Sequence, residues 1–424
     1  MQQGYGRSIG RRDFLKLGLA ALATSAAACA PAAAPAPPTG PRVSEVKVGS
    51  LHPLTGTGAF EGNLVARGVR LRIEEANAAG GIKSLGGAKI NLIEADTQGK
   101  PEVGQSETER LIREGCVVLM GAFHSAVTIV TTQVAEREGV PFVISVAVSD
   151  RILQRGFKYS FRQQPNASMM GRLTVRALKE VVDAASGQYR RVAFIHEDTE
   201  MGQSISAAAF SALKEAGFEV VEDITYNAAR ITDVTPEASR VRAANPDIIL
   251  INGYYADTLL WVRTFRDLRV SPKAIVGLAN ALLSNPNFIK EEPKLAEYMI
   301  DGNYWWNPNS ERARRVKEAY EKRYNEPFTN HSAQGYQSAD VLVDALERAA
   351  STDRDRIREA LAKTKLTDII VPGDSIEFDE TGQNKNAQPL LLQILQGVVT
   401  PVAPQKYAAG RPVFPIPPLE ERLR

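Results

Sequence analysis

The chain has 424 residues, of which 44% are hydrophobic and 24% charged, and its formal net charge is +2. This length allows two domains of ordinary size, and the composition is that of a soluble globular protein. It excludes an intrinsically disordered chain and a bundle of membrane-spanning helices. Because the small net charge gives no broad basic field, nucleic acid is not an expected partner.

The first 28 residues have the three parts of an export signal. A basic start is followed by an apolar run from Leu17 to Ala28 that ends in small residues. The segment RRDFLK, which begins with Arg11 and Arg12, resembles the twin-arginine export motif, with Gly10 in place of the usual serine or threonine. We therefore expect the twin-arginine export machinery as a partner and a location outside the cytoplasm, in the periplasm or at the cell surface.

Cys29 follows three alanines, a pattern that resembles the lipobox of bacterial lipoproteins. The same alanines also suit cleavage by an A-x-A signal peptidase, so both kinds of processing stay open. An acylated Cys29 would anchor the protein to a membrane, and the Pro/Ala-rich residues 29–43 would then form a tether. The other cysteine, Cys116, begins an apolar stretch and is predicted to be a buried small hydrophobe.

From Val43 onward, apolar strand patterns alternate with helical ones. The predicted strands are 46–51, 90–96, 116–123, 141–148, 191–198, 218–226, 247–253 and 273–279. Helical stretches lie between them, and two long helices are predicted at 310–325 and 331–350. Continuous apolar strands that alternate with helices indicate parallel sheets with both faces covered, which is an α/β fold.

Eight strands fit two sheets better than one open sheet. We expect a first lobe over 44–162 and 305–372, a second lobe over 163–304 and 373–407, and a Pro-rich C-terminal tail at 408–424. A chain that crosses several times between two lobes forms a multi-strand hinge around a cleft, where a ligand can bind.

The order of several segments resembles the substrate-binding proteins of branched-chain amino-acid (Leu/Ile/Val-binding) ABC transporters. The segments are VKVGSLHPLTGTGAFEG, LIEADTQGKPEVG, VVLMGAFHSAVT, GVPFVISVAVSD, NPDIILINGYYAD and IEFDETGQN, and the resemblance extends over about residues 45–405. It implies the type I periplasmic-binding fold, with two Rossmann-like lobes. It also implies an extracytoplasmic protein that captures a small polar ligand, amino-acid-like or a carboxylate or amide, and delivers it to the permease. The alternative is an extracytoplasmic ligand sensor that addresses a membrane receptor.

The resemblance also implies ligand-binding residues. Ser125 and Ser149 match hydroxyl positions at strand ends that hold a ligand carboxylate, and the backbone carbonyl of Ala147 lies beside them. Tyr254 matches a tyrosine that closes over the ligand from the second lobe, and Tyr255 is the neighbouring candidate. The remaining predicted wall residues are Glu61, Phe123, His124 and Met201.

One departure from the family pattern bears on the ligand. Amino-acid binders of this family commonly have an acid after the strand that corresponds to KAIVGLAN of this chain. At that place this chain has Leu278, Ala279 and Asn280. A buried ammonium group without a charge partner is costly, so an α-amino acid needs Glu61 or Asp198 as an alternative partner. Carboxylates without an amine, aromatic acids and amides stay open as ligands.

The sequence shows no catalytic machinery. It has no H-E-x-x-H pattern, no Walker loop and no metal-spaced cluster of cysteine and histidine. The segment GRSIG at 6–10 lies inside the export signal, and GTGAFEG at 56–62 has the wrong spacing for a dinucleotide loop. We therefore expect a binding protein with no cofactor and no metal, rather than an enzyme.

Overall fold

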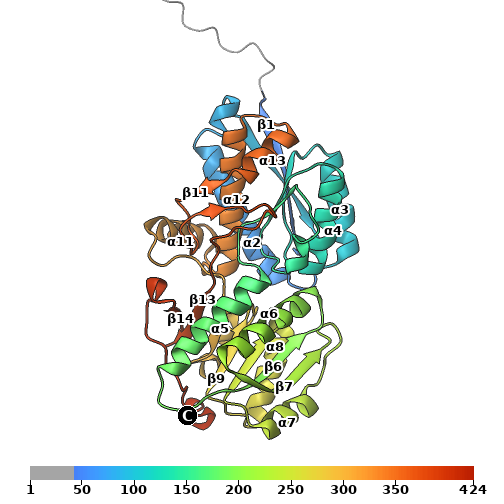
Figure 1. The fold of residues 1–424 in the computed structure, drawn as a ribbon. Helices are drawn as coiled ribbons and strands as arrows, with labels where there is room; N and C mark the ends of the chain where they lie inside the picture. The colour runs from blue at the N-terminus through green and yellow to red at the C-terminus, as the bar shows by residue number, and fades with distance from the viewer. Residues whose placement is uncertain (1–42) are drawn as a thin grey trace, which may run out of the picture. The chain divides into compact units, whose positions relative to one another are not determined.

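The computed structural model describes residues 43–424, which contain two large sheets, each covered by helices (Figure 1). The predicted export signal, with Arg11 and Arg12, and residues 29–42 of the predicted tether, with Cys29, lie outside this range. The first sheet has five parallel strands in the order β2-β1-β3-β4-β5. Its strands are β1 (Glu45–His52), β2 (Lys89–Asp96), β3 (Val118–Gly121), β4 (Phe142–Ile144) and β5 (Ser160–Arg162).

The second sheet has seven strands in the order β14-β13-β10-β9-β8-β6-β7. The five strands from β6 to β10 are parallel to one another, whereas β13 and β14 run antiparallel at one edge. Its strands are β6 (Arg191–Glu197), β7 (Glu219–Tyr226), β8 (Ile248–Asn252), β9 (Ala274–Leu278), β10 (Ile300–Asn303), β13 (Leu390–Leu395) and β14 (Val398–Ala403). The sheet is therefore mixed, where the sequence predicted a wholly parallel one.

Helices connect the strands of each sheet. In the first lobe these are α2 (Ala59–Ala78), α3 (Pro101–Arg113), α4 (Ser125–Arg137), α11 (Glu311–Tyr324), α12 (Asn330–Ala349) and α13 (Arg354–Ala362). In the second lobe they are α5 (Ala167–Asp183), α6 (Glu200–Ala216), α7 (Thr235–Ala244), α8 (Tyr255–Asp267), α9 (Pro286–Glu291), α10 (Pro293–Ala296) and α14 (Leu419–Arg422). Within residues 43–424, no helix combines the length and the apolar character needed to cross a bilayer.

The eight predicted strands and the two predicted late helices are all present, so the predicted α/β fold with two lobes is confirmed. The late helix α12 returns to the first lobe and lies beside α2, drawn in orange and blue (Figure 1). Glycines make this contact possible, because a Cβ on Gly68 would lie 2.1 Å from the Ser332 carbonyl oxygen. A Cβ on Gly335 would likewise lie 2.0 Å from the carbonyl oxygen of Val65.

The chain crosses between the lobes three times: from β5 to α5, from β10 to α11, and from β12 (Ile376–Glu377) to β13. Strand β12 pairs with β11 (Lys365–Leu366). The backbone of Gln383 forms an isolated β-bridge with Arg162 at the end of β5. The segment up to about residue 384 thus stays beside the first lobe, beyond the boundary at 373 that the sequence suggested. Three crossings form the multi-strand hinge.

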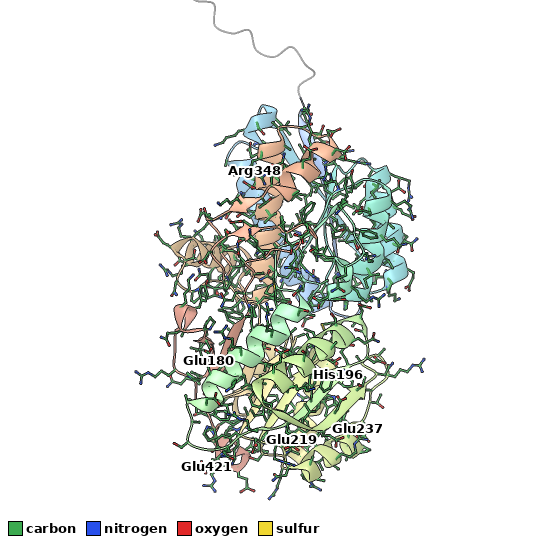
Figure 2. All side chains as sticks on the ribbon, viewed as in Figure 1. Glu180, His196, Glu219, Glu237, Arg348 and Glu421 are labelled. Atoms are coloured by element: carbon green, nitrogen blue, oxygen red, sulfur yellow. The ribbon has the colours of Figure 1, made fainter. Side chains whose placement is uncertain are left out.

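Each lobe has its own apolar core. Val48, Met120 and Leu342 belong to the core of the first lobe, and Cys116 is fully buried there, as predicted. In the second lobe, charged side chains such as Glu180, Glu219 and Glu421 lie at the surface (Figure 2). The second-lobe core extends across the junction, where Phe123, Val146 and Val148 of the first lobe pack against it.

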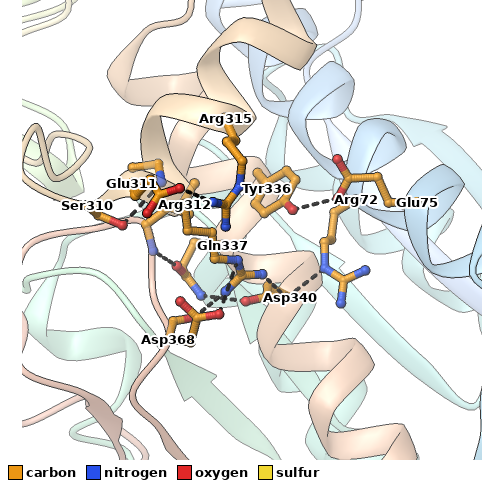
Figure 3. A network of polar contacts seen from close by, with 12 residues as sticks. Arg72, Glu75, Ser310, Glu311, Arg312, Arg315, Tyr336, Gln337, Asp340 and Asp368 are labelled. Carbon is orange, nitrogen blue, oxygen red and sulfur yellow. Dashed lines mark hydrogen bonds and ion pairs between the residues drawn. The ribbon is translucent and has the colours of Figure 1, made fainter.

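A buried carboxylate joins three helices of the first lobe (Figure 3). The Oδ1 atom of Asp340 on α12 lies 2.6 Å from Nε of Arg72 on α2 and 2.9 Å from Nη2 of Arg312 on α11. The Asp340 side chain is 5% exposed, and the two arginines are 17% and 18% exposed. One acid thus neutralises two largely buried guanidinium groups.

We expect Asp340→Ala to lower the free energy of unfolding by about 3 kcal/mol, because it leaves two buried cations without their shared partner. The matched control is Glu74→Ala, which removes an ion pair with Arg323. The side chains of Glu74 and Arg323 are 51% and 56% exposed. That change should cost less than about 1 kcal/mol. Urea denaturation of both variants measures the difference, and equal losses would contradict this interpretation.

Candidate functional site

A cavity lies where the two lobes meet. The first lobe lines it with Phe123, Ser125, the segment 146–148 and His331; the second lobe lines it with Met201, Gly253, Tyr254, the segment 279–281 and Tyr304. Most of these residues stand at the carboxyl ends of strands or at the first turns of α4, α6, α8 and α12. Open α/β sheets place ligands at this position.

The lobes are closed over this cavity. Ser149 Oγ of the first lobe donates to Oε1 of Glu200 on α6 over 2.7 Å, and Arg151 Nη1 lies 2.7 Å from Oε2 of the same residue. The backbone N–H of Asp150 donates to Oγ of Ser204 over 3.0 Å. The cavity volume is about 30 Å³, which is room for only one or two water molecules. A larger ligand therefore enters only when the lobes separate.

Ser125 marks the side of the cavity that suits an anion. Its Oγ accepts a hydrogen bond from the Ser149 backbone N–H over 3.3 Å, so its own hydrogen can be donated to a ligand. Helices α4 and α12 have no acid in their first turns, whereas α6 and α8 have Glu200 and Asp257. The free N–H groups and dipole of α4 thus favour a negative charge beside Ser125.

A buried cation stands behind this side of the wall. Arg162, 1% exposed, donates from Nη1 to the carbonyl oxygens of Ala147 over 3.3 Å and Ser149 over 2.7 Å. Burial lowers the pKa of Arg162 to about 10, so its guanidinium stays charged at neutral pH. The Ala147 carbonyl also accepts from Gln164 Nε2 over 3.0 Å. Both lone pairs of this oxygen are therefore occupied, and Ala147 contributes to the wall rather than offering a free acceptor.

Aromatic rings form much of the remaining wall. The ring centroids of Phe123 and His331 lie 5.4 Å apart and those of His331 and Tyr304 5.9 Å; behind the wall, the His124 ring lies 5.3 Å from that of Tyr254. Burial lowers the pKa of His124 to about 4 and that of His331 to about 3. Both imidazoles are therefore neutral at physiological pH, and none of the lining residues is a lysine or an arginine.

Two buried acids lie near the second-lobe side of the cavity. Glu61, in the first turn of α2, is 3% exposed and accepts one hydrogen bond, from Nδ2 of Asn285 over 3.3 Å. Asp301 on β10 is 2% exposed and accepts from Ser284 and Asn303 through Oδ2, while its Oδ1 has no partner. Burial raises the pKa of each carboxyl group to about 7.

The sequence profile of the family described as "periplasmic binding protein" matches residues 45–395. The chain belongs to the periplasmic binding protein family. A Leu/Ile/Val-binding protein homolog 7 of Brucella suis biovar 1 (strain 1330) is 29% identical over 382 residues, which cover 87% of this chain and 94% of that protein. The predicted family and the predicted role, capture of a small ligand for delivery to an ABC transporter, are thereby confirmed.

Solved structures of periplasmic binding proteins share this fold. The leucine binding protein LivK of Thermotoga maritima MSB8 superposes with a TM-score of 0.74 at 23% identity, covering 84% of this chain and 98% of that one. A solute binding protein of Rhodopseudomonas palustris BisB5, solved with 3,4-dihydroxy benzoic acid, gives 0.69 at 18% identity, with coverages of 86% and 95%. These relatives are binding proteins, not enzymes.

Within this periplasmic binding protein, the predicted site residues divide into two groups. Phe123, Ser125, Ala147, Met201 and Tyr254 line the cavity. The predicted residues that do not line it are Ser149, His124, Glu61 and Tyr255.

The residues of the second group lie close behind the cavity wall. Ser149 is bonded to Glu200, His124 packs against Tyr254, and Tyr255 packs against the second-lobe core. Sequence reasoning missed Tyr304 and His331. Tyr304 lies in the aromatic segment YWW and His331 begins a predicted helix, but neither signal identifies a cavity wall.

The loop before Glu61 has a backbone conformation that requires two of the glycines in GTGAFEG. Gly56 and Gly58 have φ angles of 71° and 78°, which glycine adopts without strain. A Cβ on Gly58 would lie 2.9 Å from the His124 ring, so the loop packs directly on this histidine. These glycines therefore shape the turn that places α2, and with it Glu61, at the junction of the lobes.

The raised pKa of Glu61 predicts a pH-dependent stability. The folded protein keeps a proton on this carboxyl group up to a pKa of about 7, whereas the usual value is 4.5, so its contribution to stability falls as the pH rises from about 4.5 to 7. Glu61→Gln removes this dependence while keeping the side-chain shape. We expect the variant to gain melting temperature over the wild type at pH 8 and to gain little at pH 5.

Differential scanning calorimetry at both pH values checks this expectation. Asp301 titrates in the same range, but it is present in both proteins and cancels in the comparison. Glu74→Gln, at a half-exposed acid on the same helix, is the matched control and should show no such pH dependence. An equal shift of Glu61→Gln at both pH values would show that Glu61 titrates normally.

Proposed function

We propose that this periplasmic binding protein captures a small ligand with a carboxylate head and an apolar body, and delivers it to an ABC transporter permease. The observation that carries the proposal is the combination of Ser125 with the acid-free first turn of α4 at an otherwise mostly apolar cavity. A carboxylate there would accept hydrogen bonds from the Ser125 hydroxyl and from free backbone N–H groups.

The relatives support a carboxylate as the common feature of the ligand. Leucine, in the name of the Thermotoga protein, and 3,4-dihydroxy benzoic acid, in the Rhodopseudomonas complex, differ in their bodies, but each has one carboxyl group. Phe123, Val146, Val148 and Met201 would surround the apolar body. Tyr254 would cover the ligand from the second lobe, because it stands at the start of α8 and lines the same cavity.

Ser125→Ala should weaken binding of a carboxylate ligand about tenfold to a hundredfold, because it removes a hydrogen bond to a charged group. Ser149→Ala is the matched comparison. It should cost less, since that hydroxyl is bonded to Glu200 and acts only on lobe closure.

A thermal-shift screen of amino acids, aromatic acids, short carboxylates and amides finds the ligand, because a ligand that binds only the folded state raises the melting temperature. Calorimetry on both serine variants then tests the site. Unchanged affinity in Ser125→Ala would place the carboxylate elsewhere.

We also propose that the protein is exported by the twin-arginine route and anchored through an acylated Cys29. The support is the order of the Arg11–Arg12 pair, the apolar run, the small residues before Cys29 and the Pro/Ala-rich tether.

The wild-type protein should therefore fractionate with membranes, and Cys29→Ser should be released into the soluble extracytoplasmic fraction. Replacing Arg11 and Arg12 by lysine should retain the precursor in the cytoplasm. Cell fractionation with immunoblotting measures both outcomes. A soluble mature wild-type protein that begins elsewhere than residue 29 would exclude the anchor, and normal export of the lysine variant would exclude the twin-arginine route.

A further inference from the structure

A second, smaller cavity lies in the hinge, and Tyr304 lines it as well as the cavity between the lobes. The first crossing lines it with residues 163–165, the second with Tyr304 and Trp305, and the third with residues 387–388. Gln334 of α12 also contributes to the wall. The three segments that connect the lobes thus meet around one small space.

Three buried polar atoms of this lining have no hydrogen-bond partner within residues 43–424. They are Oε1 of Gln163, Oε1 of Gln164 and Nε1 of Trp305. The three residues are only 1%, 1% and 5% exposed. A buried polar atom without a partner is costly, so three of them around one cavity indicate that the cavity holds a bound molecule.

The other hydrogen bonds of these side chains fix which atoms are free. Gln164 Nε2 donates to the carbonyl oxygen of Ala147 over 3.0 Å, and because that oxygen can only accept, the Gln164 amide cannot be turned around. Gln163 Nε2 donates to Oε1 of Gln334 over 2.5 Å. The indole of Trp305 has one donor and no acceptor. The cavity therefore offers two acceptors and one donor.

A water molecule matches this set in size and in chemistry. The cavity volume is about 10 Å³, which is room for a single water molecule. Water can donate one hydrogen to each amide oxygen while its own oxygen accepts from the indole N–H. A cation does not fit, because the indole N–H would direct its positive hydrogen at it. An anion would face the two amide oxygens.

The same position lacks a direct polar connection between two of the crossings. The first and third crossings are joined directly, since Arg162 Nε donates to Gln383 over 2.7 Å and Asn384 Nδ2 donates to the Gln163 carbonyl oxygen over 2.9 Å. Within residues 43–424, no hydrogen bond joins Tyr304 or Trp305 of the second crossing to the first.

We propose that the hinge contains a binding site for one water molecule, formed by Gln163, Gln164 and Trp305, and that this water links the first crossing to the second. It pairs three buried polar groups that the chain itself leaves unpaired. It also holds in place the segment whose Tyr304 lines the cavity between the lobes. The site is independent of the ligand that the protein captures.

A high-resolution crystal structure of the protein tests this inference directly. It should show a water oxygen about 2.7–3.2 Å from each of the three atoms. An empty cavity would overturn the inference, and so would a direct hydrogen bond between the Trp305 indole and either glutamine oxygen.

Nuclear Overhauser effects between water and the tryptophan indole N–H groups test the site in solution. The Trp305 N–H should give a cross-peak to a long-lived water molecule, and Trp305→Phe identifies the signal by its loss. Trp261 is the matched control, because its Nε1 is also buried without a partner but the residue lines neither cavity. The inference is wrong if Trp305 gives no cross-peak, or if Trp261 gives an equal one.

Tyr304→Phe separates the water from a nearby hydroxyl. A tyrosine hydroxyl whose proton exchanges with solvent can mimic a bound water, and Tyr304 lines the same cavity. The Trp305 cross-peak should persist in this variant, and its unshifted Trp261 signal would show that the protein is folded. Loss of the cross-peak in the folded variant would assign the effect to the hydroxyl and contradict the water site.

Discussion

One buried guanidinium fixes the part of the molecule on which the site depends. Arg162, at the end of β5, donates to the carbonyl oxygens of Ala147 and Ser149 and, through Nε, to Oε1 of Gln383 over 2.7 Å. A charge removed from water must have its donors satisfied, so these three acceptors are held together. Ala147 lines the cavity, Arg162 stands at the start of the first crossing between the lobes and Gln383 lies in the third, so a single desolvated charge fixes the wall relative to the hinge.

The hydrogen bonds that hold the first-lobe wall differ in kind from the contacts that close the cleft. On the first lobe, the wall beside Ser125 is held by hydrogen bonds within that lobe and to the segment that follows β5. The contacts that close the cleft are of another type. The Glu200 carboxylate meets Ser149 and a largely exposed Arg151, and Glu61 meets Asn285 through one long bond. Exposed ion pairs and single hydrogen bonds are worth little. The polar contacts across the cleft are therefore weak, and apolar packing of Phe123, Val146 and Val148 against the second lobe completes the closed interface.

The cost of burying a charge also explains which groups line the cavity and which stand behind its wall. Aromatic rings and the neutral imidazole of His331 line it, and its titratable groups stand behind the wall, Arg162 on one side and the acids on the other. Charges placed in this way orient a ligand without occupying the space that its body needs. In a medium of low dielectric constant they act more strongly than surface charges would.

The sequence alone determined the fold to a large extent. Apolar runs that alternate with helical periodicity identify the eight central strands, because a parallel sheet covered on both faces needs such runs whatever the tertiary details. Short or edge strands such as β5 and β14 were missed, since three residues, or a strand that contains Pro401, carry no clear period. The ordered landmarks also placed Phe123, Ser125, Met201 and Tyr254, which lie in the loops or first helical turns after strands and therefore stand at the carboxyl edge of a sheet.

Only the tertiary structure decided how these residues are used. Ser149 lies next to the cavity, but its hydroxyl faces Glu200, and the Ala147 carbonyl is occupied by Arg162 and Gln164. Tyr304 and His331 come from the second crossing and from a helix that returns to the first lobe. The reason is physical: strand and helix patterns are local, whereas hydrogen-bond partners and the burial of a charge depend on residues as far apart as Glu61 and Asn285. These become neighbours only when the two lobes close.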